Sequence, residues 1–344
     1  MFTKETINKL RSHSKHMDQK REVPAEVLDW MYAEKLFKLF VPETLGGRML
    51  TLPEAVQVFQ KTAAIDGNIG WLTTIGSGGG MFVANFTEEW ADKLFTPENA
   101  VLAGSGHPTG KGVKTDDGYI VNGTWRYCSG SQFASFFTAN CMTDDDEIVS
   151  FILMKEQVQV VEDWDAFGLK ATGSHTIKVE NALVPEDRTF SIFEIKNNFK
   201  GLVHSFPFVQ FSQASFAAVC LGIGEHFYEE ATAIAEKNKD RWSELRFSNV
   251  TDKIKEQESV YKGAVDNFYS GITSSWNNHE AGISLLEEEL EAFSSTCKQS
   301  AQATFDGVQS LIRMLGMEAV MESSTLNRIW RDLYTAGQHS FLTQ

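Results

Sequence analysis

The chain has 344 residues, of which 42% are hydrophobic and 22% are charged, and its formal net charge is -15. This length is enough for two or three domains of about 100–200 residues each, and the composition excludes a disordered or collagen-like protein. The acidic balance argues against nucleic acid as the main partner, because proteins that bind a phosphate backbone carry a basic surface.

The cysteines and the apolar segments indicate a cytoplasmic protein. The four cysteines are scattered without CxxC spacing, which predicts reduced thiols rather than a metal site or a disulfide framework. The first residues, "MFTKETINKLRSHSKH", lack the apolar core of a signal peptide, and no run of about 18 uncharged apolar residues occurs. We therefore expect no secretion and no membrane span.

The first 100 residues follow a helical period. One helix is predicted to begin near Pro24, which suits a first helical turn, and "VPETLGGRML" then interrupts the pattern with two turn glycines. A second helix follows from Pro53, and a third apolar stretch begins at Trp71. Residues 1–100 are therefore predicted to form an all-α domain.

Residues 101–195 change to short strands, separated by Gly, Asp and Asn clusters that suit tight turns. The clearest strands are predicted in "GYIVNGTWRYC", "FFTANCMT", "IVSFILM" and "HTIKVENALV". This pattern predicts a small antiparallel β-barrel or sandwich.

Long helical patterns return from about residue 208, and residues 196–344 are predicted to form the C-terminal helical domain. The clearest apolar stripe advances in steps of three and four residues, and its members are Leu286, Leu290, Phe293, Cys297, Ala301, Phe305, Val308, Ile312 and Leu315. We therefore predict an α+β fold, mostly α, in which a helical domain, a β-domain and a helical bundle follow one another.

Two long segments of the β-region, "AGSGHPTGKGVKTDDGYIVNGTWRYCSGSQFASFF" and "WDAFGLKATGSHTIKVENALVPED", resemble the middle domain of the acyl-CoA dehydrogenase superfamily. More narrowly, "GTWRYCSGS" and the terminal "RIWRDLYTAGQH" are similar to its flavin-dependent monooxygenase branch, the two-component hydroxylases of phenols, aromatic steroid intermediates and dibenzothiophene. The resemblance spans nearly the whole chain, and it implies that the C-terminal part is a four-helix bundle.

The resemblance also implies a reaction and its partners. Reduced FMN or FAD from a separate NAD(P)H-flavin reductase would react with O2 to give a C4a-hydroperoxide, which the protein must protect from water until it oxygenates a small organic substrate, such as an aromatic one. No GxGxxG fingerprint opens a strand-helix unit, which agrees with reduction by a partner. No motif separates FMN from FAD.

The "GTWRYCSGS" segment supplies the first cofactor residues that the resemblance implies. Ser129 matches the serine near flavin N5, and Trp125 and Ser131 lie in the same motif. On the residues alone, there are two interpretations. The glycine lets the backbone approach a flat ring closely while the two hydroxyls hydrogen-bond to it, or the hydroxyls merely satisfy the backbone of a turn.

Two further segments are matched to the ring and to the phosphate of the cofactor. Thr172, Gly173 and Ser174 are similar to the second ring-facing segment, and a hairpin turn is the alternative. Arg246, with Arg241 in reserve, lies where an arginine of a neighbouring subunit meets the flavin phosphate, which suits the forked donors of arginine. The alternative for the stretch with Arg246 and Arg241 is a charged helix end that is simply exposed to solvent. The resemblance implies a homo-oligomer, usually a tetramer.

The end of the chain contains the candidate catalytic histidine. Arg328 and Asp332 are four residues apart and can pair on one helix face, worth about 0.3–0.5 kcal/mol. His339 lies two turns further if the helix continues past Gly337, which weakens that turn. The resemblance implies that His339 reaches the reaction side of the flavin, where a pKa near 6.5 would let it exchange protons. We expect His339 and Ser129 to act in catalysis.

Three departures bear on the substrate. The terminal segment lacks the "YEGT"-like glutamate of most acyl-CoA dehydrogenases, which disfavours thioester dehydrogenation unless another helix supplies the base. Counting from the pocket residue Trp71, Gly79 stands where the phenol hydroxylases that the chain resembles carry a histidine. Either the substrate is not a phenol, or another group supplies the contact, with His107 and His175 as the candidates. His107 is otherwise an ordinary loop histidine. The chain also ends soon after His339, which predicts a more open, peroxide-leaking site or a non-catalytic flavin-binding relative.

Overall fold

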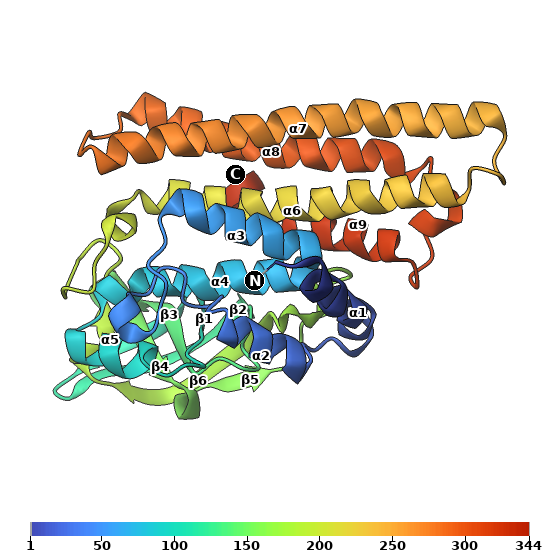
Figure 1. Cartoon of the computed structure of the whole chain (residues 1–344). Helices are drawn as coiled ribbons and strands as arrows, with labels where there is room; N and C mark the ends of the chain where they lie inside the picture. The colour runs from blue at the N-terminus through green and yellow to red at the C-terminus, as the bar shows by residue number, and fades with distance from the viewer. Residues whose placement is uncertain (1, 344) are drawn as a thin grey trace.

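The computed structural model describes residues 2–343, and it consists of two helical layers on one side of a β-sheet (Figure 1). The first part of the chain forms the helices α1 (Lys4–Lys20), α2 (Ala25–Ala33), α3 (Leu52–Ile65), α4 (Gly67–Gly80) and α5 (Glu88–Phe95). The all-α prediction for this part is confirmed. Every helix between residues 2 and 343 is too short or too polar to cross a bilayer.

The starts of α3 and α4 follow from their capping residues. Thr51 and Glu54 form a reciprocal capping box at the start of α3. Asp66 caps α4 by accepting a hydrogen bond from the backbone N–H of Asn68 over 2.8 Å. Asp66 also ends α3, so two buried helices meet at a sharp corner at this residue.

The middle of the chain forms one seven-stranded sheet. Its strands are β1 (Leu102–Thr115), β2 (Gly118–Cys128), β3 (Phe136–Thr143), β4 (Ile148–Met154), β5 (Gln159–Val161), β6 (His175–Val184) and β7 (Thr189–Phe190). The four strands predicted between the turn clusters are confirmed as β2, β3, β4 and β6. The order in the sheet is β5-β6-β2-β1-β3-β4-β7.

The sheet differs from the prediction in one pairing. β1 pairs with β3 in parallel, whereas the other neighbouring pairs are antiparallel. The glycine-rich sequence of β1 hides this strand from a search for alternating apolar residues. The register of β1 against β3 shifts between Ser105 and Gly110, so the residues between them bulge out of the sheet.

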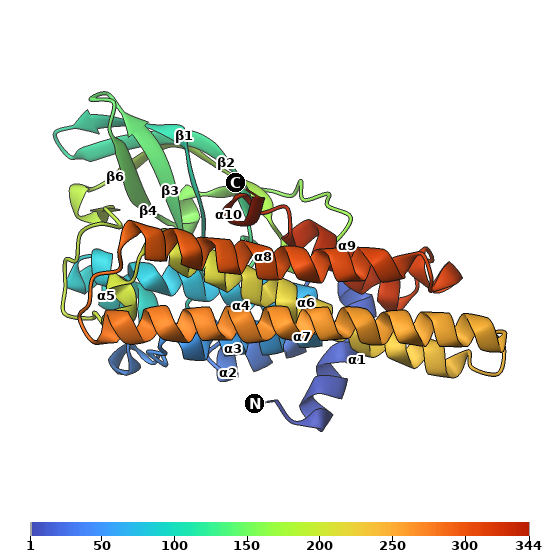
Figure 2. The same ribbon diagram turned by 90° about the horizontal axis from the view of Figure 1, so that it is seen from above.

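The last part of the chain forms the helical bundle, and its helices are α6 (Phe208–Lys237), α7 (Glu244–Glu280), α8 (Glu287–Ile312) and α9 (Thr325–Ala336), followed by the short α10 (Ser340–Thr343). The predicted four-helix bundle is therefore confirmed. The three long helices run side by side, and α10 packs against α6 and α8 (Figure 2). The chain division near residues 100 and 195 stays a prediction.

The helices from both ends of the chain share one hydrophobic core. This core joins Leu10 and Met17 of α1 to Leu333 and Ala336 of α9 and includes most of α3 and α6. The β-sheet has a separate core made of residues between Ala103 and Val184. The surfaces where these two cores meet are therefore where side chains from all three parts of the chain can gather.

Candidate active site

A buried hydroxyl network joins α4 to two turns of the β-domain. The Trp71 indole Nε1 donates to Ser129 Oγ over 2.9 Å, and Ser129 Oγ lies 2.7 Å from Ser174 Oγ. Ser174 Oγ lies 2.7 Å from Thr172 Oγ1, and the Thr172 hydroxyl donates to the Leu169 carbonyl over 2.8 Å. All five residues are buried. The structure thus brings the predicted hydroxyl residues into contact with one another and with Trp71.

The two turns of this network are also linked through their backbones. The N–H of Gly130 donates to the Thr172 carbonyl over 2.8 Å, and Ser131 Oγ donates to the Gly173 carbonyl over 2.8 Å. Gly130 and Gly173 have φ values of +78° and +51°, which favour glycine. The hydroxyl of Ser131 therefore uses its proton to hold the two turns together.

His339 lies beside the hydroxyl network, in the turn between α9 and α10. Its ring stacks on Phe216 with centroids 3.8 Å apart and on Phe341 at 5.6 Å, and it lies 5.8 Å from the Trp71 ring. α9 ends at Ala336, so the chain turns back toward Trp71 rather than continuing as a helix. His339 is therefore part of a packed site.

The predicted near-neutral pKa of His339 is wrong. Burial among the aromatic rings, followed by the charge of nearby His107, lowers the pKa of His339 to about 4. The imidazole is therefore neutral at pH 7. Its Nδ1 accepts from the backbone N–H of Phe341 over 3.4 Å, which leaves the proton on Nε2.

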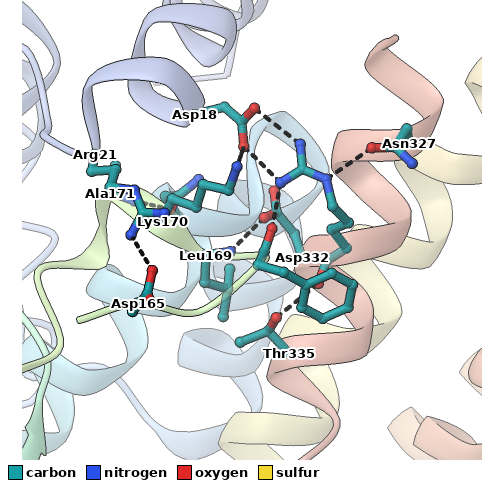
Figure 3. Close-up of polar contacts among 12 residues, drawn as sticks. Asp18, Arg21, Asp165, Leu169, Lys170, Ala171, Asn327, Asp332 and Thr335 are labelled. Atoms are coloured by element: carbon teal, nitrogen blue, oxygen red, sulfur yellow. Dashed lines mark hydrogen bonds and ion pairs between the residues drawn. The ribbon is translucent and has the colours of Figure 1, made fainter. Parts of the chain in front are cut away.

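Asp332 of α9 anchors the turn that carries the second half of the network (Figure 3). Its Oδ1 accepts from the N–H of Leu169 over 2.6 Å, and Asn68 Oδ1 accepts from the N–H of Ala171 over 2.9 Å. Leu169 has a φ of +50°, which is uncommon for a residue other than glycine, so these contacts hold a strained turn in place. Burial, followed by the charge of Asp66, raises the pKa of Asp332 to about 8.

Arg331 ties the same turn to the first helix of the chain. Its Nη1 and Nη2 donate to the Asp18 carboxylate of α1 over 2.8 and 2.9 Å, and its Nε donates to Asn327 over 2.8 Å. Arg331 Nη1 also bonds the Phe167 carbonyl, and Lys170 Nζ lies 3.5 Å from Asp18 Oδ1 (Figure 3). Residues from α1, the β-domain and α9 thus meet around one guanidinium.

The structure does not contain the predicted pairing of Arg328 with Asp332 on one face of α9. Both residues are buried, with 7% and 3% of their surface exposed. Asp332 instead accepts the hydrogen bond from Leu169, because the face of α9 that carries it packs against the β-domain turn. The spacing of four residues does place Arg328 and Asp332 on one helix face, but the burial of that face depends on residues distant in the sequence.

Trp125 does not fit the prediction that it contacts the cofactor. Its side chain is 0% exposed in the core of the β-domain, and its Nε1 donates to the Asn140 carbonyl over 2.8 Å. The ring fills space beside Gly110 and Gly123, where an added Cβ would approach Trp125 within 2.1 and 2.5 Å. Trp125 therefore supports the strand that leads to Ser129 from the inner face of the sheet.

Gly79, which the resemblance matches to a histidine of the substrate pocket, does not face open space. A Cβ on Gly79 would lie 2.8 Å from the Cβ of Leu102, whereas a Cβ on Gly78 would meet nothing within 4 Å. Gly78 follows Trp71 by seven residues, nearly two helical turns, so both lie on the same face of α4. Gly79 is rotated by about 100° from Gly78. The glycine that leaves open space on the Trp71 face of α4 is therefore Gly78.

The two candidate replacement histidines differ in their surroundings. His107 lies in the exposed bulge of β1 and is near enough to His339 to lower the pKa of that residue. His175 is buried, and its Nδ1 accepts from the N–H of Trp164 over 3.0 Å. His107 can therefore reach toward the site, whereas His175 supports the backbone.

Arg246 is not brought together with Ser129 and His339 within one chain. It lies in the first turn of α7, where Ser243 caps the helix, and its guanidinium lies 4.5 Å from the centre of the Trp242 ring. Cavities of about 380 and 410 Å³ are both lined by Arg246. The start of α7 is at the far tip of the bundle, away from α10, in both views (Figures 1 and 2). Arg241 is exposed in the same α6–α7 connection.

Several site residues were missed from the sequence. Phe216 and Phe341 surround His339, and Tyr127 projects from the bulge before Ser129 with 64% of its surface exposed. Tyr127 has a φ of +68° and contacts Trp164 edge-on at 6.3 Å. A helical stripe does not distinguish a site-facing aromatic residue from a core one, so the signal for Phe216 was absent.

The comparison with known families agrees with this architecture. Residues 2–100 match "Acyl-CoA dehydrogenase, N-terminal domain", and residues 214–344 match "Acyl-CoA dehydrogenase, C-terminal domain". The β-domain lies between these two matches. The chain belongs to the acyl-CoA dehydrogenase superfamily.

Within this superfamily, the chain is similar to several oxygenases. The indole-3-acetate monooxygenase of Pseudomonas putida is 23% identical over 96% of this chain and 87% of its own length. The oxygenase subunit HsaA of a flavin-dependent monooxygenase from Rhodococcus jostii is 24% identical over 96% of this chain and 91% of its own.

Solved structures give the same fold. The 3-HSA hydroxylase of Rhodococcus sp. RHA1 superposes with a TM-score of 0.91 at 21% identity, over 98% of this chain and 91% of its own. XiaF from Streptomyces sp., solved with FADH2 and glycerol, gives a TM-score of 0.84 at 20% identity, over 98% and 92% of the two chains. FMN-bound TdsC from Paenibacillus sp. gives 0.77 at 17% identity, with the same coverage.

Proposed function

We propose that this protein is the oxygenase component of a two-component flavin-dependent monooxygenase. The observation that carries the proposal is the convergence of Ser129, Ser174 and Thr172 with Trp71 and His339 between the helical core and the β-domain. The relatives with oxygenase names, and the neighbours solved with FADH2 or FMN, support this function. The cofactor is FMN or FAD in its reduced form.

The residues present fit a flavin ring. Ser129 Oγ accepts one hydrogen bond from Trp71 and keeps a lone pair for a ring N–H. The left-handed Gly130 lets the backbone approach a flat ligand closely, and the exposed ring of Tyr127 stands in the same turn. Ser129, Gly130 and the 172–174 turn would therefore hold the ring edge, with Ser131 keeping the two turns joined.

The protein's own residues would protect and orient the reaction. A bound reduced flavin would supply the electrons that activate O2 for the transfer of one oxygen atom. Phe216, Phe341 and Trp71 exclude water from one side, which limits proton leakage. Neutral His339 offers its Nε2–H as a hydrogen-bond donor and does not act as an acid at pH 7, because its pKa is about 4.

The substrate is proposed to be small and aromatic. Phe82, Phe208, Phe341 and Phe216 form a continuous series of rings, with neighbouring centroids 6.1, 6.4 and 6.1 Å apart, that leads toward His339. Gly78 leaves open space on the face of α4 that carries Trp71. These apolar, flat surfaces suit an aromatic ring, and His107 is the candidate polar contact at the exposed edge.

The proposed partners are a separate NAD(P)H-flavin reductase, O2 and further copies of this chain. We propose a tetramer in which Arg246 meets the flavin phosphate of a neighbouring subunit, because this residue is remote from Ser129 in its own chain and lines two cavities. The four free, buried cysteines support a cytoplasmic location, in which thiols stay reduced.

The alternatives are an acyl-CoA dehydrogenase-like enzyme and a non-catalytic flavin-binding relative. In the described part of the chain, the groups found around Trp71 are hydroxyls, aromatic rings and His339 rather than a carboxylate base. The favoured reaction is therefore oxygenation, because removal of an α-proton from a thioester needs a base.

The deciding experiment is flavin binding followed by mixing with O2. The purified protein is titrated without oxygen with FMN and FAD in both redox states, and the reduced complex is then mixed with O2 and an aromatic substrate panel. We expect tight binding of a reduced flavin, a transient absorbance change and an oxygenated product. Flavin binding without any of these reactions would favour the non-catalytic relative, and bleaching of bound oxidised flavin by acyl-CoA thioesters would favour the dehydrogenase.

A further inference from the structure

The protons of the hydroxyl network can be placed from its two ends. At one end, the Thr172 hydroxyl contacts the Leu169 carbonyl, which only accepts, so Thr172 must donate its single proton there. Thr172 Oγ1 can then only accept from Ser174, and Ser174 must use its own proton for that bond. Ser174 in turn accepts from Ser129, so the proton of Ser129 points to Ser174.

The other end of the network agrees with this direction. The Trp71 indole Nε1 is a donor only, so it donates to Ser129 Oγ. Every hydroxyl proton in the network is therefore engaged inside the protein. Ser129 can accept one more hydrogen bond, but it can donate one only if an internal bond is broken.

We propose that Thr172 and Ser174 are positioning residues that make Ser129 a fixed hydrogen-bond acceptor, so that the site selects the reduced flavin. A reduced flavin carries a hydrogen on N5 and can donate it to Ser129, whereas N5 of an oxidised flavin has only a lone pair and needs a donor. This inference rests on the proposed flavin site and explains how the chain itself distinguishes the two redox states.

The direction of the network depends on the position of the Leu169 carbonyl. The Trp164 indole also donates to this carbonyl over 2.9 Å, and Asp332 holds the Leu169 N–H in the left-handed turn. Through Asp332, α9 therefore helps to set the direction in which Ser129 of the β-domain donates its hydrogen bond. The network is buried, so water does not supply a competing proton at its inner end.

The test compares Thr172→Val with Thr172→Ser in the full-length protein. The dissociation constants of oxidised and reduced FMN and FAD are measured without oxygen. In the wild type, we expect reduced flavin to bind at least about tenfold more tightly than oxidised flavin, the ratio that one hydrogen bond typically gives. Thr172→Val frees the proton of Ser174 and lets the network reverse, so Ser129 can donate to oxidised N5.

The expected signature of Thr172→Val is tighter binding of oxidised flavin and a redox preference reduced by about tenfold, equal to a fall of about 30 mV in the midpoint potential of the bound flavin. Local damage would weaken both redox states instead. Thr172→Ser retains the hydroxyl and should keep the wild-type ratio. Thr62→Val removes a buried hydroxyl that donates to helix carbonyls away from the site and should also keep it.

The outcomes separate this inference from the proposed function. If the wild type binds no flavin, both fail. If it binds flavin but shows no preference, or if Thr172→Val and Thr172→Ser give equal ratios, the inference is overturned and the oxygenase proposal stands. If Thr172→Val does not fold, Ser174→Ala takes its place, because it also frees the proton of Ser129, and an unchanged ratio in that variant overturns the inference.

Discussion

The imidazole of His339 is surrounded by aromatic rings, and its chemistry follows from that environment. Burial against Phe216 and Trp71 keeps the ring neutral, so in the proposed oxygenase His339 would donate a hydrogen bond rather than carry a charge. A side chain near the end of a chain usually frays, but here it is stacked between rings from α4, α6 and α10.

Replacing His339 with Asn is expected to uncouple the proposed reaction. The amide retains hydrogen-bonding capacity but loses the flat ring that stacks on Phe216, so water reaches the site. We expect reduced flavin to bind within about threefold of the wild-type affinity, while the ratio of product to H2O2 falls by about tenfold or more. Both products are measured after a single turnover. An unchanged ratio would remove His339 from the catalytic site.

Asp332 gives a pH dependence that can be measured without flavin. Because its pKa is raised to about 8, the folded protein holds this proton more tightly than the unfolded chain, whose carboxyl titrates near its ordinary value. Stability from this group is therefore lost as the pH rises from about 4 to about 8, by up to about 1.4 kcal/mol per unit. Asp332→Asn retains an acceptor for Leu169 but removes the titration.

The measurement is the thermal midpoint of wild type and Asp332→Asn between pH 5 and pH 8.5. The difference between the two proteins should grow in favour of Asn as the pH rises. A constant difference would mean that Asp332 is already ionised in the folded protein at pH 5. Asp306→Asn is the matched control, because this exposed aspartate lies on the surface of α8.

At the scale of elements, α4 shapes one side of the site through the side chains that its glycines lack as well as through Trp71. Gly76 and Gly79 allow Phe37 and Leu102 to pack closely against the helix, since an added Cβ would lie 2.4 and 2.8 Å from these side chains. Gly78 has no such neighbour. The glycine series therefore combines close packing on some faces of α4 with free space on another.

The pair Gly78→Ala and Gly79→Ala tests this difference within one helix. Gly78→Ala should raise the free energy of unfolding by up to about 1 kcal/mol, because alanine favours the helix and its Cβ meets open space. Gly79→Ala should lower it by about 1–3 kcal/mol, because Leu102 must move. Urea unfolding measures both. Equal effects would contradict the assignment of the two faces.

The sequence predicted elements better than it predicted side-chain surroundings. Strands β2, β3, β4 and β6 are short apolar segments bounded by clear turn residues, so local patterns were sufficient. The parallel partner β1 is rich in glycine and was missed. Ser129, Ser174 and Thr172 were found through family motifs, but the burial of Trp125, the free space at Gly78 and the anchor at Asp332 depend on contacts between distant segments.

At the scale of the whole molecule, the site is built from parts that are far apart in sequence. Arg331 and Asp18 are separated by 313 residues, yet they share a partly buried ion pair beside the turn that carries Thr172. One part of the proposed site, Arg246, lies at the start of α7, at the tip of the bundle, and in the proposed tetramer it would act in a neighbouring copy of the chain. Assembly and cofactor binding are therefore expected to depend on each other.

Arg246→Gln tests this dependence. Loss of the guanidinium should raise the dissociation constant of reduced FMN by about tenfold or more, because a charge-assisted hydrogen bond to phosphate is worth about 1.5–3 kcal/mol. Arg241→Gln is the matched control and should change it by less than about threefold. Riboflavin, which lacks the phosphate, should bind the wild type and Arg246→Gln equally. Equal losses for riboflavin and FMN would show that Arg246 does not meet the phosphate.

The core shared by both ends of the chain sets an order for folding during synthesis. The buried residues of the β-domain core lie between Ala103 and Val184, so this core can close once that segment has left the ribosome. The helices α1, α3 and α4 must wait for α6 and α9 before their apolar faces are covered. The nascent chain therefore carries an uncovered helical layer until α9 has been made, and this is the stage at which we expect chaperones to act.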